Sequence, residues 1–270
     1  MTSNRSIPNV LTIAGSDPSG GAGIQADLKS FSALGAYGTS VVTALTAQNT
    51  RGVRGVHPVP EAFIRLQLDT LLDDVAIDAV KIGMVVSREV AETIRNALEA
   101  RRPRWIVLDP VMVAKSGDIL VDDVGIVAVR EVLVPLADLM TPNLPEAAVL
   151  LGCDAPTTRT DMEAMAPRLA ALGAGAVLLK GGHLQGESCP DLLITPGKTQ
   201  WLEGTRIATS NLHGTGCSLS SAITARLALG DPLPEAVANA KQWLETALAE
   251  SRRLDVGHGH GPVHHFHRWW

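Results

Sequence analysis

The chain has 270 residues, of which 46% are hydrophobic, and its formal net charge is −5. This composition is typical of a globular α/β protein with a substantial core. The mildly acidic balance, an aromatic content of 3% and the lack of a Lys/Arg-rich run argue against nucleic acid or an anionic membrane as the main partner. No apolar run approaches the roughly 20 residues of a membrane span, so the expected partner is a small molecule.

Three cysteines, Cys153, Cys189 and Cys217, are widely spaced and form no CxxC pair. An odd and scattered set favours neither a disulfide framework nor a cysteine zinc site. Pro8 interrupts the N-terminal apolar stretch, and Asp17 follows it in place of a small-residue cleavage site, so we expect no targeting segment. These features predict a cytoplasmic protein in a reducing compartment.

Short apolar runs alternate with helical periodicity along the chain. Residues 10–14 predict a buried strand, which is followed by a glycine loop at 15–23 and a helix at 24–34. Residues 37–46 predict a second strand that ends at Gln48 and Asn49, and 53–59 predict an extended segment. The helix that begins at Pro60 has an apolar face made of Phe63, Ile64, Leu68, Leu71 and Leu72.

The same alternation continues to the C-terminus. Strands are predicted at 79–82, at 105–108, in a short run that ends at Met140, and at 176–179. A β-hairpin is predicted at 191–195 and 199–202. Helices are predicted at 87–100, 122–133, from Asn143 onward, and at 161–172, 218–229 and 234–253. Strands alternating with helices of about ten to fifteen residues predict a mostly parallel, doubly wound sheet with helices on both faces. We expect one domain over residues 1–270.

In sheets of this type, ligands bind beyond the carboxyl ends of the strands. Residues that follow a predicted strand end should therefore share one rim of the sheet. They are Gly15, Gln48, Gly83, Asp109, Asn143 and Lys180.

A glycine turn, His213-Gly214-Thr215-Gly216-Cys217, opens directly onto a predicted helix. Glycine permits backbone conformations in which several N–H groups converge, and the helix N-terminus adds partial positive charge. Such a turn binds anions, phosphate above all. We expect the helix terminus also to lower the pKa of Cys217 from its usual value of about 8.5. The alternative is an ordinary turn with a packed cysteine.

The rim and the turn together hold the groups used in phosphoryl transfer. Asp109, Asn143 and Glu146 offer oxygen ligands for a hydrated Mg²⁺ ion. Lys180 can neutralise phosphate oxygens, the N–H groups of residues 214–217 can hold charge in the transition state, and Cys217 can accept a proton from a hydroxyl. The chain has no GxxxxGK[ST] motif, so it is not a P-loop enzyme.

Several of these residues have structural alternatives. Asp109 can cap a turn, Asn143 and Glu146 can cap a helix, and Lys180 alone can be a solvated charge. The 15–23 loop lacks the GxGxxG spacing of an NAD-dependent oxidoreductase. His213 and Cys217 could instead form the nucleophilic pair of a hydrolase that needs no nucleotide.

Two segments, AGSDPSGGAGIQAD at 14–27 and HGTGC at 213–217, resemble hydroxymethylpyrimidine/phosphomethylpyrimidine kinases. These enzymes are ribokinase-like kinases of thiamine biosynthesis. The resemblance also covers residues 47–50, 81–84, 109–118, 141–146, 180–183 and 261–270, and so spans nearly the whole chain. It implies a ribokinase-like fold, a central and mainly parallel sheet with helices on both sides, which coincides with the periodicity.

The resemblance implies transfer of the ATP γ-phosphate to the hydroxymethyl group of an aminopyrimidine, and then a second phosphorylation that gives the diphosphate. Cys217 matches the position where sugar kinases of the superfamily carry an Asp base. Gln48 matches the pyrimidine-binding glutamine, whose amide offers both a donor and an acceptor.

The other roles implied by the resemblance can be grouped by ligand. The catalytic turn is Gly214, Thr215, Gly216 and Cys217; Gln48, Gly15, Asp17, Met84 and Val111 bind the substrate; Lys180, Asn143 and Asp109 bind ATP phosphates; Asp109 and Glu146 bind Mg²⁺. The implied assembly is a homodimer.

Two further alternatives remain. A pyridoxal-type kinase is the nearest rival, because pyridoxine is also a flat nitrogen heterocycle with a hydroxymethyl group. The five histidines within residues 258–267 would suit a metal site, but the resemblance and the glycine and apolar residues between them favour a structural closure.

Overall fold

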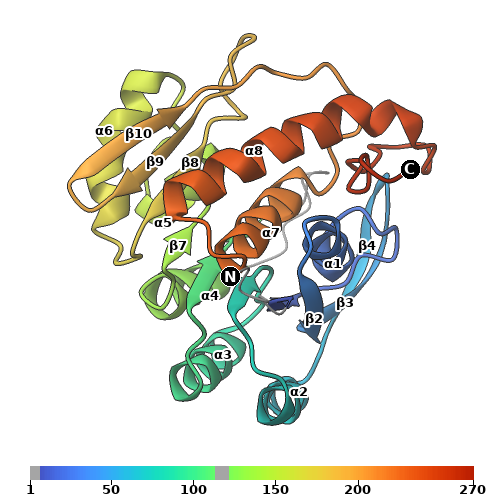
Figure 1. Cartoon of the computed structure of the whole chain (residues 1–270). Helices are drawn as coiled ribbons and strands as arrows, with labels where there is room; N and C mark the ends of the chain where they lie inside the picture. Colours follow the sequence, from blue (N-terminus) through green and yellow to red (C-terminus); the bar gives the residue numbers. More distant parts are fainter. Residues whose placement is uncertain (1–6, 113–121) are drawn as a thin grey trace, which may run out of the picture.

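The computed structural model describes residues 7–112 and 122–270 (Figure 1). Its main sheet has eight strands in the order β10-β9-β8-β7-β6-β5-β1-β2. The six neighbouring strands β8, β7, β6, β5, β1 and β2 are parallel to one another, whereas β9 is antiparallel to β8 and to β10. The prediction of a mostly parallel sheet is confirmed. The strands are β1 (Asn9–Ala14), β2 (Tyr37–Val42), β5 (Ala79–Ile82), β6 (Trp105–Leu108), β7 (Leu139–Met140), β8 (Val177–Lys180), β9 (Asp191–Thr195) and β10 (Lys198–Leu202).

Helices cover both faces of this sheet (Figure 1). Alternate residues of a strand point to opposite faces, so Ile106 and Leu108 of β6 join one core while Val107 joins the other. The first core receives α2 (Glu61–Asp74), α3 (Arg88–Ala100), α4 (Asp123–Ala128), α5 (Leu144–Leu151) and α6 (Arg159–Ala170); the opposite face receives α1 (Gly23–Ala33), α7 (Thr215–Ala228) and α8 (Leu233–Ala249). Within the described ranges, no helix combines the length and apolar character that crossing a membrane requires.

The strand expected at 37–46 is in fact divided between two sheets. Strand β2 ends at Val42, and β3 (Ala44–Asn49) pairs with β4 (Gly52–Pro58) in a separate antiparallel sheet. Buried Thr43 makes the break, because its N–H donates to Ala14 O at 2.9 Å and its hydroxyl donates to Met84 O at 2.8 Å. Gln48 therefore stands on the small sheet and not at the rim of the large one.

The apolar face expected for α2 is narrower than its spacing indicates. Ile64 and Leu68 are fully buried, whereas Phe63 is 55% exposed. Phe63 precedes Ile64 by one residue, which turns its side chain about 100° away from the packed face. The expectation that Phe63 faces the core is wrong.

The histidine-rich tail packs against the helices of the second face. The ring of His265 lies near Trp243 of α8, and its Nε2 atom is 2.9 Å from the hydroxyl of Ser218 on α7. Phe266 and Trp270 stack on each other. These contacts fit a structural closure, and the described part of the chain holds no group of three His, Cys, Asp or Glu side chains placed to bind a metal ion.

His265 should make stability depend on pH. Burial lowers its pKa from 6.5 to about 3, so the stability that it contributes is complete above pH 6.5 and is lost as pH falls toward 3. We expect His265→Gln to lose less stability than the wild type on acidification through this range. Urea unfolding at a series of pH values measures the difference, with exposed His258→Gln as the control. Parallel curves for His265→Gln and the wild type would contradict this account.

Candidate active site

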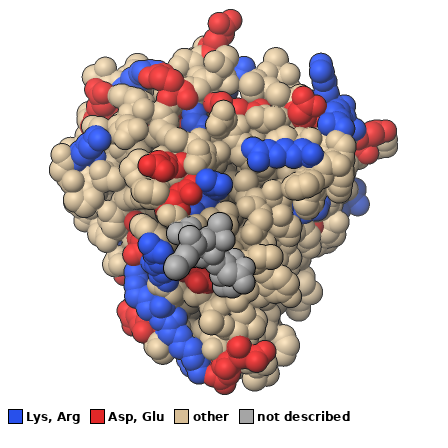
Figure 2. Space-filling model, viewed as in Figure 1, with Lys and Arg blue, Asp and Glu red and all other residues tan. Residues whose placement is uncertain are grey.

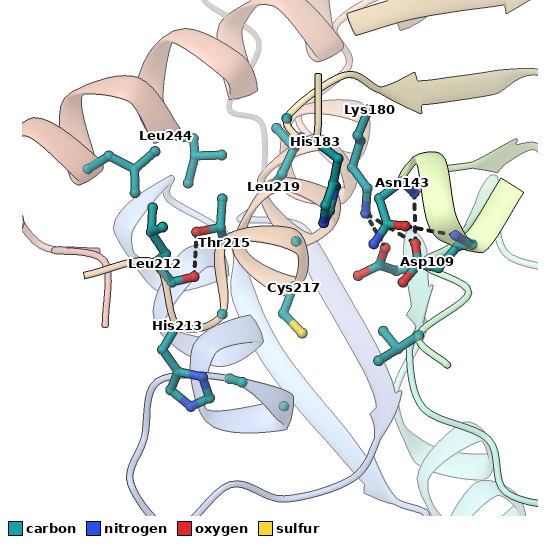
Figure 3. A pocket seen from close by; sticks show the side chains of 18 of the residues that line it. Asp109, Asn143, Lys180, His183, Leu212, His213, Thr215, Cys217, Leu219 and Leu244 are labelled. Atoms are coloured by element: carbon teal, nitrogen blue, oxygen red, sulfur yellow. Dashed lines mark hydrogen bonds and ion pairs between the residues drawn. The ribbon is translucent and has the colours of Figure 1, made fainter. Parts of the chain in front are cut away.

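A pocket lies beyond the carboxyl ends of the parallel strands. It is lined by the loop after β1, the small sheet, the loop after β6, the start of α5, and the α7 and α8 helices (Figure 3). All the residues proposed from sequence for substrate, phosphate, metal and catalysis line it: Gly15, Asp17, Gln48, Met84, Asp109, Val111, Asn143, Glu146, Lys180, Gly214, Thr215, Gly216 and Cys217. Gly83 of the expected rim is not among the lining residues. Residues 113–118 of the segment 109–118 lie outside the described residues.

The glycine turn before α7 is pressed against the glycine loop after β1. Gly214 has a φ of 74°, in the left-handed region, and a Cβ there would lie 1.7 Å from Gly21 O. Only glycine fits both the backbone conformation and the contact. The turn places the N-terminus of α7 at the pocket, as an anion-binding turn requires.

Asp17 joins these two loops. Its carboxylate accepts hydrogen bonds from the N–H and hydroxyl of Ser19 and from the N–H of Ala22, and it lies 2.7 Å from Nε2 of His213. Burial alone would raise the pKa of Asp17, but the bonds to His213 and Ser19 lower it to about 2. A carboxylate so fully engaged shapes the loop, which favours a positioning role over the expected direct contact with substrate.

The alternative pairing of His213 with Cys217 does not form. The His213 ring is bonded to Asp17, and in Figure 3 it points away from the sulfur. A hydrolase with a Cys–His pair would need the imidazole within hydrogen-bonding reach of the thiol.

The expected low pKa of Cys217 is wrong. Burial raises the pKa of this thiol to about 11, and the opposing effects of Lys81 and of the Gly23 N–H do not compensate for it. Desolvation disfavours the thiolate, and the nearby carboxylates of Asp27 and Asp109 add to this effect. Cys217 therefore carries its proton at neutral pH.

Asp109 and Lys180 form a largely buried ion pair in the wall of the pocket (Figure 3). Lys180 Nζ is 2.9 Å from Asp109 Oδ1, which also accepts a hydrogen bond from Thr141 at 3.0 Å. Burial alone would lower the pKa of Lys180, but Asp109 and Glu146 raise it. Lys180 is thus a fixed cation in the pocket and not a solvated charge.

Asn143 and Glu146 cap the start of α5. Glu146 N–H donates to Asn143 Oδ1, and Asn143 N–H donates to Glu146 Oε2, both at 2.8 Å. The helix-cap alternative is therefore correct for these contacts. Burial raises the pKa of Glu146 to about 7, with Lys180 opposing and Asp109 adding to the effect. A cation bound here would replace the proton of this carboxyl group.

Comparison with known proteins decides among the functions that this geometry permits. The family model described as phosphomethylpyrimidine kinase matches residues 17–264. The chain belongs to this family. The hydroxymethylpyrimidine/phosphomethylpyrimidine kinase of Escherichia coli is 52% identical over 264 residues, which cover 97% of this chain and 98% of the relative.

Solved structures agree with this assignment. A phosphomethylpyrimidine kinase from Clostridium difficile is 43% identical, with a TM-score of 0.79, and the match covers 89% of this chain and 99% of the other. The ADP complex of Bacillus subtilis pyridoxal kinase is 38% identical, with a TM-score of 0.89, and the match covers 96% and 98%. The fold is ribokinase-like, and the protein is a phosphotransferase.

In this kinase, a bulge in β3 presents Gln48 to the pocket. The register of β3 on β4 shifts between Ala47 and Gln48, and such a bulge re-aims the following side chains. Thr46 is bonded to Ser16 O at 2.8 Å and lies 3.2 Å from Gln48 Oε1, which ties the small sheet to the loop after β1.

The absence of a side chain at Gly15 makes room for Met84. A Cβ at Gly15 would lie 2.6 Å from Met84 Cε. Since Gly15 and Met84 both line the pocket, this contact fixes the shape of its wall beside Gln48.

Two features of the pocket were missed by the reasoning from sequence. One is Lys81, which lines it and is paired with Asp27; a lysine inside the apolar run AVKI was the available signal. The other is an apolar wall without any motif in the sequence, made of Ile207, Leu212, Leu219, Leu244 and Leu248.

Proposed function

We propose that this kinase transfers the γ-phosphate of ATP to the hydroxymethyl group of 4-amino-5-hydroxymethyl-2-methylpyrimidine, and then phosphorylates the monophosphate to the diphosphate for thiamine biosynthesis. One observation carries the proposal. Gln48 and Met84, suited to a flat nitrogen heterocycle, line the same pocket as the Gly214 turn and the cation of Lys180. The relatives named for this activity support the choice of substrate.

The substrate ring would be recognised by Gln48. Its amide can accept a hydrogen bond from the exocyclic amine and donate one to the adjacent ring nitrogen. Met84, Gly15 and Val111 supply apolar surface beside it. The ring is thereby held with its hydroxymethyl group toward α7.

The phosphates of ATP would lie against the N-terminus of α7. The N–H groups of residues 214–217 can donate to the phosphoryl oxygens, and Lys180 neutralises their charge. The apolar wall of the pocket offers a surface for the adenine ring. A relative solved with ADP supports nucleotide binding by this fold.

Proton removal from the hydroxyl would fall to Cys217. As the oxygen–phosphorus bond forms and the bond to the β-phosphate oxygen breaks, the hydroxyl proton passes to the sulfur. The thiolate is the form that can accept it. Because burial raises the pKa of Cys217 to about 11, this form is scarce at neutral pH, and activity should rise with pH.

The acidic side chains of the site fit Mg²⁺. Asp109 and Glu146 offer carboxylate oxygens and Asn143 an amide oxygen, and Mg²⁺ prefers a few oxygen ligands together with several waters. When bound there, the ion would neutralise charge on the ATP phosphates. Lys180 pairs with the Asp109 carboxylate at 2.9 Å and so holds this ligand in place.

The second candidate is a pyridoxal kinase. The likeness to the Bacillus subtilis pyridoxal kinase favours it, because the TM-score is 0.89 over 96% of this chain. Pyridoxine offers the same phosphate acceptor, a hydroxymethyl group on a nitrogen heterocycle.

An assay with each alcohol separates the two candidates. The protein is incubated with MgATP and either the aminopyrimidine, its monophosphate or pyridoxal, and ADP and phosphorylated product are followed. We expect turnover with both pyrimidines and a lower kcat/KM with pyridoxal. ADP formation with pyridoxal alone would overturn the proposal.

Gln48→Leu should then weaken pyrimidine binding by about 1 to 3 kcal/mol, because the polar edge of the ring would be left without a partner. Calorimetric titration with the pyrimidine measures this loss. Binding of ATP serves as the internal control. Equal pyrimidine affinity in the two proteins would rule out the proposed orientation of the ring.

We also propose that the kinase acts in the cytoplasm as a homodimer, with no nucleic-acid or membrane partner. Acidic and basic side chains are mixed on the face shown in Figure 2, which supports the choice of a small-molecule partner. Tyr37, Leu45 and Val56 are exposed apolar residues of β2, β3 and β4. They offer a surface for association of two copies.

A further inference from the structure

An ion pair lies in the core beside the active site. Lys81 of β5 is fully buried, and its Nζ atom donates to the two carboxylate oxygens of Asp27 on α1 at 3.1 and 2.9 Å. The same carboxylate accepts hydrogen bonds from Thr12 on β1 at 2.6 Å and from Ser221 on α7 at 2.7 Å. Four elements of the fold therefore meet at one pair of charges.

Packing alone does not account for this pair. Burial of two charges carries a desolvation cost that their attraction often fails to recover, and apolar side chains of similar volume are often as stable. None of the contacts proposed for the pyrimidine, the phosphates or Mg²⁺ involves Lys81 or Asp27. The position of the pair relative to Cys217 points to its role.

The α1 and α7 helices pack against each other beside the ion pair. Ser221 follows Cys217 by four residues, and Asp27 follows Gly23 by four, so each couple lies on one face of its helix. The hydroxyl of Ser221, one turn beyond Cys217 on α7, donates a hydrogen bond to Asp27 on α1 at 2.7 Å. Cys217 thus lies one helical turn from the ion pair.

The ammonium of Lys81 lies close against the backbone of Gly83. A Cβ at Gly83 would lie 2.8 Å from Nζ, so the absence of a side chain there makes room for the cation. Lys81 nevertheless lines the same pocket as Cys217. A buried positive charge, held by Asp27, is therefore part of the pocket wall to which Cys217 also belongs.

Cys217 is influenced by charges from several elements. Lys81 on β5 and Lys180 on β8 are the cations, and Asp27 on α1 and Asp109 after β6 are the anions. After burial, which raises the pKa of the thiol, Lys81 has the largest effect and lowers it, whereas Asp27 raises it.

We propose that Lys81 is a positioning residue for Cys217, whose fixed ammonium, oriented by Asp27, supplies positive charge beside the sulfur when the thiol loses its proton. Its part in catalysis rests on the proposed kinase function. The electrostatic coupling between Lys81 and Cys217 is independent of that function and can be measured without any substrate.

The direct test is the pH dependence of alkylation of Cys217 by iodoacetamide, because only the thiolate reacts. Peptide mass spectrometry separates Cys217 from Cys153 and Cys189. In Lys81→Met, we expect the midpoint to rise by about one pH unit, which slows alkylation about tenfold at a given pH. In Asp27→Asn, the midpoint should fall.

The opposite signs distinguish electrostatics from damage to the fold, because a loosened core would expose Cys217 and lower the midpoint in both variants. Lys198→Met on the exposed end of β10 is the matched control and should leave the midpoint unchanged. If a single variant does not fold, Lys81→Met combined with Asp27→Asn carries the test. Its midpoint should also lie above that of the wild type, because the effect of Lys81 on the thiol exceeds that of Asp27.

A kinetic measurement then tests the catalytic part. We expect the pH profile of kcat with the pyrimidine to shift upward in Lys81→Met along with the alkylation midpoint. Unchanged alkylation midpoints, or shifts of the same sign in both single variants, would overturn the proposal. A shifted alkylation midpoint with an unshifted kcat profile would overturn the catalytic role alone. If the protein phosphorylates no pyrimidine, alkylation still decides whether the two residues are coupled.

Discussion

Cys217→Ala should lower kcat by on the order of 10²-fold or more while leaving the affinities for pyrimidine and ATP largely intact. The methyl group cannot accept the hydroxyl proton, but the N–H groups of the turn belong to the backbone and remain in place. The Gly214 turn is fixed by its contact with Gly21, so it does not depend on the cysteine side chain. Steady-state kinetics with calorimetric titration of both ligands would separate the two effects.

The pH dependence of kcat is a second measurement that tests the role of Cys217. Wild-type activity should climb with pH toward the raised pKa of Cys217, whereas residual activity of Cys217→Ala should lose this slope. Cys153→Ala is the matched control, because that thiol lies outside the pocket lining. Undiminished turnover in Cys217→Ala would remove the sulfur from the role of base.

Lys180→Met should lower kcat/KM by on the order of 10²-fold or more, because one preorganised charge on the transferring phosphoryl group is lost. It should also destabilise the protein. Asp109 would lose its partner at 2.9 Å and remain as a buried carboxylate, which is costly when unpaired. Kinetics with MgATP and thermal unfolding measure the two consequences.

Lys198→Met removes a lysine from an exposed position and should change neither quantity. If Lys180→Met had reduced stability and unchanged kcat/KM, the role of Lys180 would be limited to pairing with Asp109. Normal stability with reduced kcat/KM would show instead that the Asp109 carboxylate tolerates the loss of its partner.

The sequence predicts the large sheet well because its inner strands are short, apolar and buried on both faces, so each stands out against the helical periodicity. The rim follows from the same pattern, since parallel strands bring Asp109, Asn143 and Lys180 to one edge. The division at Thr43 was not predictable from local pattern. It depends on hydrogen bonds to Ala14 and Met84, which are distant in sequence.

The pKa values and charge pairings of the site were harder to predict than the identity of the residues that line it. The N-terminus of α7 is visible as a glycine turn, but the burial that raises the pKa of Cys217 depends on how α1 packs against α7. The contact of Asp17 with His213 joins residues 196 positions apart, and that of Lys81 with Asp27 spans 54. Neither pairing leaves a local pattern that periodicity could detect.

The apposition of Gly21 with Gly214 has a consequence for how the molecule acquires activity. Residues near the beginning of the chain and near its end must both be present before the anion-binding turn can close. Contacts of such high sequence separation form slowly, because the intervening chain loses loop entropy first. On the ribosome, the phosphate site should be the last part of the enzyme to mature, after the strands from β1 to β8 have already emerged.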